Sequence, residues 1–343
     1  MNIVSPTNVF VGLDYHAKSV QVCVLDREGK VLLNRSCGND QETIANTVSL
    51  WCGQGTVVQA AIESCCGAAN LAEELIGKAG WIVNLAHPGY VNRMKQNPDK
   101  TDFSDARLLA DLQRVGYLPK VWMAPEDVRE LRRLVRYRHQ LAGDRRNLKL
   151  RIRAALREGR IVTPNCTAWT KLWLKWLRET APLSTQTRWV IDKQLQRLSE
   201  VQQEINEVEQ RLKGLSQDDE VVQRLLAQPG IGLVTAVTIR AEIGRFDRFR
   251  SGKQLAKFCG LSPRNASSGE RQADAGLIKT GNRELRTVLI EAAHRLARHD
   301  EQWIKLHGRL RARGKKGSVI AAAVANRWVR KLYHQMQPAA LAL

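Results

Sequence analysis

The sequence lacks a cysteine pattern typical of a zinc site, and it lacks an apolar run long enough to cross a bilayer. Its seven cysteines are odd in number and have no zinc-ligand spacing, so we expect reduced thiols, which are typical of cytoplasmic proteins. A membrane span needs about 20 apolar residues in a row. The first residues contain no basic segment followed by an apolar run. We therefore expect a cytoplasmic protein with no signal peptide and no membrane partner.

Acidic residues are too few to balance the basic ones. The 343 residues include 54 Lys and Arg against 34 Asp and Glu, a formal net charge of +20. Residues 1–120 hold 11 basic and 12 acidic residues, so the whole excess lies downstream. Residues 129–160 alone hold 12 basic and 3 acidic residues. This asymmetry predicts a near-neutral first unit followed by a region that binds a polyanion.

The first third of the chain combines strand patterns with helix patterns. A strand meander is expected first, with a turn at 26–29 between its second and third strands. The expected strands are 8–13, 20–25, 31–33, 57–62 and 81–85, and the expected helices are 44–51, 67–79 and 102–115. Strands that form a meander and then alternate with helices predict a mixed α/β sheet covered by helices.

Downstream of residue 125 the pattern becomes helical. Apolar residues recur at spacings of three, four and seven within 131–155 and 191–215, which predicts two long helices with heptad-like stripes. An antiparallel pair within one chain and a coiled coil between chains both fit. Between these helices, Trp169, Trp173 and Trp176 have the spacing of one helical face. Such a face is more typical of a core or an interface than of a base-stacking platform.

The rest of the sequence predicts a second compact unit. The segment Gln228-Pro-Gly-Ile-Gly232 lies between expected helices at 221–227 and 234–243, which is the signature of a helix-hairpin-helix turn. Its glycines would let backbone amides approach a phosphate closely. A last helix is expected at 283–298. The expected domain boundaries are 1–122 for the mixed sheet, 123–218 for the long basic helices, 219–334 for the second compact unit and 335–343 for a frayed tail.

Four acidic residues stand where a metal site would be built on a mixed sheet. Asp14 and Glu63 each end an apolar strand, and Asp102 and Asp105 share one face of the first turn of a helix. Such carboxylates can hold Mg²⁺, with Mn²⁺ as the alternative ion, for phosphodiester chemistry. Taken singly, Asp102 also fits a helix N-cap and Asp14 a turn. A purely structural role explains Glu63 less well, because burying a carboxylate directly after a buried strand costs free energy unless the carboxylate has a partner.

A serine lies far downstream in a basic loop. Ser268 is surrounded by Arg264, Arg271 and Lys279, and cations would neutralise the charge of a phosphate that a serine hydroxyl attacks. On local sequence alone, Ser-Ser-Gly is better explained as an ordinary polar turn. The adjacent Ser267 leaves open which serine would act.

Phosphate contacts along a basic helix provide affinity but little sequence information. The residues expected to contact nucleic acid are Arg132, Arg133, Arg136, Arg145, Arg146, Lys149, Arg153, Gly230, Gly232, Arg264, Arg271, Lys279, Lys315 and Lys316.

In their order along the chain, these motifs resemble one family, the transposases of insertion-sequence family 110, which includes the Piv-type site-specific invertases. The resemblance runs from about residue 8 to about residue 330. The matching segments are Val-Gly-Leu-Asp14, Ile-Glu63, Lys-Thr-Asp102-Phe-Ser-Asp105-Ala-Arg, Pro-Gly-Ile-Gly232, Phe-Cys-Gly-Leu-Ser-Pro-Arg264 and Ser268-Gly269. Each motif is weak alone, whereas the ordered set is specific.

The resemblance implies a fold and a chemistry. It implies a RuvC-like domain with an RNase H fold, whose DEDD metal site would be Asp14, Glu63, Asp102 and Asp105. It also implies a mostly α-helical remainder, with a coiled coil and a transposase domain that carries the helix-hairpin-helix and the catalytic serine, matched by Ser268. Small departures are Tyr15-His16 after the first Asp and Cys65-Cys66 after the Glu. His16 would be either adjacent to the metal ligands or inert.

The resemblance further implies partners. Members of the family act as dimers that pair into tetramers, and a structured non-coding RNA guides them by bridging donor and target DNA. The sequence contains nothing similar to a zinc finger or a homeodomain, and base pairing with a guide would explain that absence. The function expected is thus an RNA-guided DNA recombinase with a Mg²⁺-assisted phosphoserine intermediate. The alternatives are a hydrolytic RuvC-like junction nuclease and a non-enzymatic coiled-coil protein that binds nucleic acid.

Overall fold

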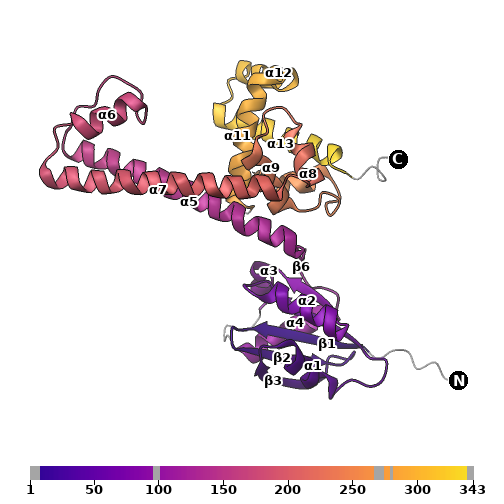
Figure 1. The fold of residues 1–343 in the computed structure, drawn as a ribbon. Coiled ribbons are helices and arrows are strands. Elements are labelled where there is room, and N and C mark those ends of the chain that lie inside the picture. Colours follow the sequence, from indigo (N-terminus) through magenta and orange to yellow (C-terminus); the bar gives the residue numbers. More distant parts are fainter. Residues whose placement is uncertain (1–7, 96–100, 266–273, 279–280, 338–343) are drawn as a thin grey trace. The chain divides into compact units, whose positions relative to one another are not determined.

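The computed structural model describes residues 8–95, 101–265, 274–278 and 281–337. The chain divides into two compact units, Met1–Ala124 and Pro125–Leu343. The first is a sheet with helices and the second is mostly helical (Figure 1). In the part of the chain that the structure describes, no helix is both long and apolar enough to cross a membrane.

A six-stranded sheet with the order β3-β2-β1-β4-β5-β6 forms the first unit. Its strands are β1 (Asn8–Tyr15), β2 (Ser19–Leu25), β3 (Val31–Gly38), β4 (Val57–Glu63), β5 (Ile82–Ala86) and β6 (Lys120–Val121). The first three strands form an antiparallel meander, β4 and β5 run parallel to β1, and β6 is antiparallel to β5. The predicted mixed sheet is therefore confirmed.

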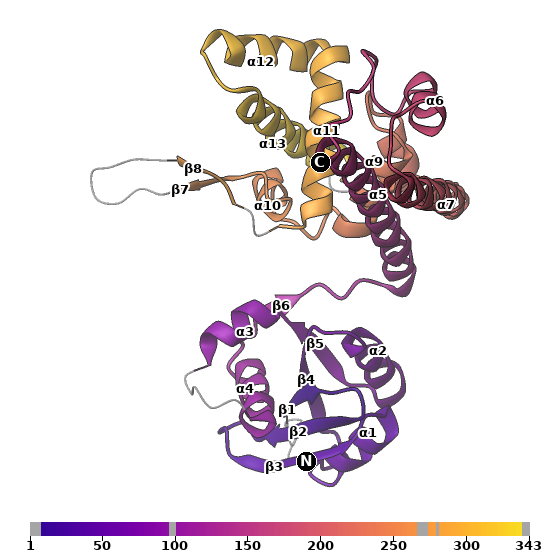
Figure 2. The same ribbon diagram turned by 90° about the vertical axis from the view of Figure 1, so that its left-hand side faces the viewer.

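Helices cover both faces of this sheet (Figure 2). They are α1 (Gln41–Ser49), α2 (Ala68–Ala79), α3 (Pro88–Met94) and α4 (Asp102–Arg114). Successive residues of a strand point to opposite faces. In β1, Val11 and Leu13 accordingly belong to the core under α1 and α2, whereas Phe10 packs with Ala106 and Ala110 of α4. This alternation decides which β1 side chains face α4.

Two long antiparallel helices begin the second unit. They are α5 (Glu126–Glu158) and α7 (Thr185–Leu215), and they pack side by side within one chain (Figure 1). Their direction follows from the polar pairs between them: Arg138 binds Glu209, whereas Arg145, further along α5, binds Gln202, which is earlier in α7. Of the two arrangements that the heptad-like stripes allowed, this chain contains the intramolecular pair.

A short helix, α6 (Lys171–Glu179), packs on the end of this pair where α5 finishes and α7 begins. Trp173 is 2% exposed, and its ring lies 4.7 Å from that of Trp169 and 5.9 Å from that of Trp176. The tryptophans thus form a core, as expected, but the prediction that all three share one helical face is wrong. The side chain of Thr170 caps α6 by accepting a hydrogen bond from the amide of Trp173, so Trp169 precedes the helix.

The remaining helices form one bundle around a shared core. They are α8 (Glu220–Leu226), α9 (Leu233–Ile243), α10 (Gly252–Phe258), α11 (Arg283–His299), α12 (Glu301–Ala312) and α13 (Gly317–Gln335), and the small sheet beside them pairs β7 (Pro263–Asn265) with β8 (Asp274–Leu277). The expectation that the helix at 283–298 is the last one is wrong. Two further helices follow because Trp303 and Leu306 of α12 and Trp328 and Leu332 of α13 are buried on the inner faces of their helices.

Candidate metal centre and nucleic-acid surfaces

Asp14 lies on the sheet face that α4 covers. Two residues before it, Gly12 is in van der Waals contact with the backbone of α4 at Ala106 and Ala110. Because strand side chains alternate, Asp14 points to the same face as Gly12. Its side chain is 16% exposed. The glycine therefore lets the helix approach closely, and the carboxylate emerges beyond it, near the helix start.

The first turn of α4 carries Asp102 and Asp105. Neither aspartate caps the helix. The side chain of Thr101 accepts a hydrogen bond from the amide of Ser104 at 3.2 Å, and the Ser104 hydroxyl oxygen accepts one from the amide of Thr101 at 3.4 Å. This capping box satisfies the helix end by itself. The alternative of Asp102 as an N-cap is therefore wrong, and its 57% exposed carboxylate is left without that local structural role.

His16 connects the two elements. Its Nε2 lies 3.4 Å from Oδ2 of Asp14 and 3.2 Å from Oδ2 of Asp102. Ligand atoms of these three residues all lie within 4.8 Å of one another. On the other carboxylate of the turn, Lys95 Nζ lies 2.7 Å from Oδ2 of Asp105. Positively charged or proton-donating groups therefore occupy positions among the carboxylates where a cation would compensate the charge.

Glu63 ends β4, directly beside the end of β1. Leu13 pairs with Ile62 in the parallel ladder, so Asp14 and Glu63 follow at adjacent strand ends. Ala61, two residues before Glu63, packs with Leu109 of α4, and alternation places the half-buried Glu63 on that face as well. Among the described residues, however, the close three-residue group contains His16 and neither Glu63 nor Asp105.

The electrostatics of Asp14 reflect this crowding. Burial raises the pKa of the Asp14 carboxyl above its ordinary value of 3.8; the neighbouring Asp105 and Asp102 raise the pKa further, while His16 and Lys95 oppose the rise. Carboxylates that repel one another in a partly buried site favour a divalent cation, and carboxylate oxygens suit Mg²⁺ or Mn²⁺, whereas an imidazole donor suits a transition metal better than Mg²⁺. The donor set therefore fits a divalent metal ion.

The serine loop falls largely outside the described residues. The residues of this loop that lie outside the described part of the chain include Ser267, Ser268, Arg271 and Lys279. Arg264, in β7, is exposed.

The hairpin between α8 and α9 combines a glycine of positive φ with a helix start that has no side-chain cap. Gly230 has a φ of +74°, a conformation that favours glycine, and Gly232, the N-cap residue of α9, has no side chain that could cap the helix. Arg295 of α11 fixes the turn: its Nε donates to the carbonyl of Gly230 at 2.8 Å, and a terminal nitrogen donates to Thr235 Oγ1 at 3.1 Å. The first turn of α9 thus has no side-chain cap from Gly232, and its residues line a groove.

This groove has a volume of about 910 Å³ and lies between α5, the hairpin and α11. Arg145, Arg146 and Arg283 are among the residues that line it. Sequence reasoning did not identify Arg283, Arg295 or His139 as parts of this surface. Their separation in sequence from the hairpin leaves no local pattern that would have found them.

The basic residues of α5 differ in their contacts. Arg136 binds Glu242 of α9 through two hydrogen bonds of 2.9 and 3.1 Å, and Arg132 donates to the carbonyl of Ala241 at 3.0 Å, so both help to join α5 to α9. Arg136 nevertheless keeps 58% of its side chain exposed, and Arg146 and Arg153 are exposed too. The other expected contacts are partly engaged: Arg133 pairs with Glu126 and Glu130, Arg145 donates to Gln202, and Lys149 lies 5.0 Å from the ring of Trp169.

Comparison with known proteins identifies the family. A protein-family model named DEDD_Tnp_IS110 and described as "Transposase" matches residues 11–160. A second family model, described as "Transposase IS116/IS110/IS902 family", matches residues 222–308. The chain is 28% identical to the transposase for insertion sequence element IS1111A of Coxiella burnetii, over 92% of this chain and 86% of that protein. It is 27% identical to the transposase for IS1328 of Yersinia enterocolitica, over 95% of this chain and 96% of that protein. The chain therefore belongs to the IS110 family of transposases.

Proposed function

We propose that this chain is an RNA-guided DNA recombinase of an insertion sequence, which cuts and rejoins DNA through a divalent-metal site and a serine nucleophile. One observation carries the proposal: Asp14, His16 and Asp102 come from two distant sequence segments, yet their ligand atoms lie within 4.8 Å of one another. A set of convergent carboxylates at the end of a sheet suits metal-assisted phosphodiester chemistry.

The metal site would use Asp14, Glu63, Asp102 and Asp105, which occur along the chain in the order D, E, D, D that names the first family model. When bound, Mg²⁺ or Mn²⁺ would polarise the scissile phosphate and neutralise charge on it. His16 is placed to contribute a nitrogen donor or to orient the two aspartates. Lys95 would hold Asp105 in place.

We assign the domains accordingly. Residues 1–122 would be the RuvC-like domain, supported by a meander that continues into parallel strands with α4 across one face. Residues 123–218 would be the coiled-coil region and residues 219–334 the transposase domain. The hairpin at Gly230 and Gly232 and the exposed arginines of α5 would contact phosphates.

The strand exchange would proceed by two transesterifications. Ser268 Oγ forms a bond to phosphorus as the bond from phosphorus to the 3′ oxygen breaks; the serine proton passes to a base, and the 3′ oxygen leaves as a hydroxyl. The 3′-hydroxyl of the partner strand then attacks the phosphoserine and releases the serine. Because each step exchanges one phosphodiester for another, the reaction conserves bond energy and requires no ATP. A dimer that pairs into a tetramer would provide the serines and hold the donor and target DNA strands.

Labelled DNA tests the chemistry. We expect wild-type protein with Mg²⁺ and the guide RNA to retain label on denaturing electrophoresis, whereas Ser268→Ala forms no covalent adduct but still binds DNA. Ser267→Ala is the matched control and should keep the adduct. Free DNA ends with no adduct, in wild type and Ser268→Ala alike, would instead indicate the hydrolytic junction nuclease.

The guide requires its own test. RNA transcribed from the non-coding sequence beside the gene should be needed for recombination, and changing the loop that pairs with the target should redirect the product to the matching new target. Equal recombination with and without RNA would contradict guidance while leaving the serine chemistry standing.

A further inference from the structure

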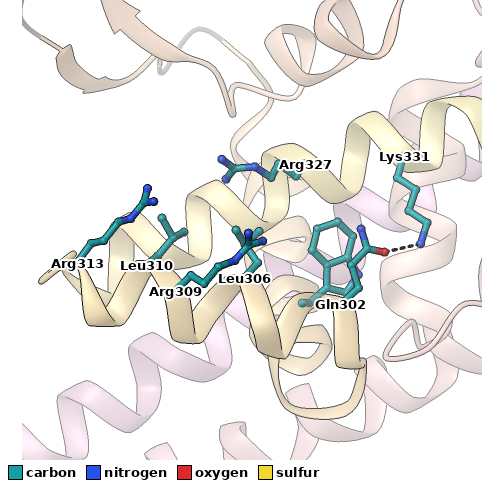
Figure 3. A pocket seen from close by; sticks show the side chains of 8 residues that line it. Gln302, Leu306, Arg309, Leu310, Arg313, Arg327 and Lys331 are labelled. Carbon is teal, nitrogen blue, oxygen red and sulfur yellow. Dashed lines mark hydrogen bonds between the residues drawn. The ribbon is translucent and has the colours of Figure 1, made fainter.

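A second basic groove lies between α12 and α13, apart from the hairpin. It has a volume of about 360 Å³. Four of its lining residues are cationic: Arg309 and Arg313 from α12 and the residue that follows it, and Arg327 and Lys331 from α13 (Figure 3). All four are exposed. Among the described residues that line this groove, none is acidic.

The spacing of these cations is electrostatically unfavourable for the protein alone. Arg309 and Arg313 are four residues apart on one helix, and so are Arg327 and Lys331 on the other. Like charges at this spacing are neighbours on a helix surface and repel each other. An external polyanion would compensate two such pairs facing one concave surface.

The floor of the groove argues against reading of bases. Trp303 is 3% exposed and Leu306 is 8% exposed, so the indole ring is not available to stack on a base. Lys331 is held above this floor: it donates to Gln302 Oε1 at 2.8 Å, and its Nζ lies 5.9 Å from the centre of the Trp303 ring. The groove therefore offers exposed positive charge, with Lys331 held in place, and its buried indole ring provides no base-stacking surface.

We propose that this α12–α13 groove binds the sugar–phosphate backbone of a nucleic acid without sequence preference. The proposal goes beyond the function proposed above, because the binding needs neither the metal site nor the serine. All four cations also lie outside the segment 222–308 that the second family model matches. The basic turn with Lys315 and Lys316 joins the two helices, so it would extend the same surface.

Binding measurements on the full chain test this proposal. The groove variant is Arg309→Gln, Arg313→Gln, Arg327→Gln and Lys331→Gln together. A matched variant removes the same charge from four exposed residues of α6 and α7, namely Lys171→Gln, Arg178→Gln, Arg197→Gln and Arg211→Gln. Fluorescence anisotropy with a labelled DNA duplex and a labelled RNA hairpin, in EDTA and between about 50 and 200 mM salt, gives the dependence of affinity on salt. Circular dichroism and thermal melting check that both variants are folded.

We expect the groove variant to bind more weakly and to lose about 0.9 from the slope of log affinity against log salt for each duplex phosphate contact removed, or about 2 to 4 in all. The α6–α7 variant should change that slope by less than about 1. A loss on DNA alone, on RNA alone or on both supports the groove and identifies which backbone it holds. Equal slopes for the two folded variants on both ligands would overturn the proposal. Because EDTA prevents metal chemistry, failure of the metal site does not affect this result.

Discussion

Gly12 of β1 lies directly against Ala106 of α4: a methyl group on Gly12 would lie 1.8 Å from the carbonyl oxygen of Ala106 and 2.6 Å from the amide nitrogen of Ala110. Both contacts are with backbone, which cannot yield by rotating a side chain. This close approach sets the distance between the end of β1, with Asp14, and the first turn of α4. The proposed metal centre thus depends on a residue that carries no functional group.

Gly12→Ala should therefore destabilise the first unit and misplace the aspartates of α4. We expect a loss of about 1–3 kcal/mol, typical of overpacking, and a smaller rise in melting temperature on addition of Mg²⁺ than in wild type. Gly77→Ala on α2 is the matched control, because a methyl group there meets no atom within 4 Å and alanine favours a helix. Equal melting behaviour of the two variants would contradict this role of Gly12.

Asp14→Asn should separate stability from metal binding. The raised pKa of Asp14 means that its protonated form stabilises the fold below the ordinary value of 3.8 and that this contribution is lost as pH rises through the folded-state pKa. At neutral pH in EDTA the variant should therefore melt no lower than wild type. Wild type should gain about 2.7 kcal/mol when Mg²⁺ is 100-fold above its dissociation constant, whereas the variant should gain almost nothing. Equal stabilisation of both proteins would exclude Asp14 as a ligand.

His16→Ala should reveal whether the imidazole is a metal ligand. Its Nε2 lies within 3.4 Å of two carboxylates, and imidazole suits transition metals better than Mg²⁺. We expect Mn²⁺ affinity to fall about 10-fold or more, with a smaller loss for Mg²⁺, as measured by titration calorimetry. A loss of the same factor for both ions would indicate that His16 only orients the aspartates.

Arg136→Ala should destabilise the second unit. Glu242 is 7% exposed and accepts two hydrogen bonds from Arg136. Arg132 Nε lies 3.8 Å from Oε2 of Glu242, so Arg132 would compensate part of the buried charge. We expect a loss of about 1–3 kcal/mol in denaturant unfolding. Arg133→Ala is the control, because its exposed pairs with Glu126 and Glu130 should contribute less than about 1 kcal/mol. If both variants lost equally little stability, the pair with Glu242 would have no structural weight.

Local sequence patterns were sufficient to predict strands β1 to β5 and most of the helices, whereas β6 was not predicted. The ends of β1 and β4, marked by Asp14 and Glu63, and the helix that begins at Asp102 lie within a few residues of the predicted positions. Helix α12 was missed because basic residues are interleaved with the buried Trp303 and Leu306, so the high charge hid an apolar stripe that packing makes visible. Helix α13 was missed as well.

The sequence by itself determined most of the secondary structure, the charge asymmetry and the order of motifs that places the chain in its family. Only the tertiary structure decided which side chains meet: His16 between Asp14 and Asp102, Lys95 on Asp105, Arg136 on Glu242, and four cations in one groove. The physical reason is that the spacing of apolar residues along the sequence indicates which face of a helix or strand is buried. Contacts between charged groups distant in sequence depend instead on strand order and on how closely a helix can approach a sheet, which here one glycine sets.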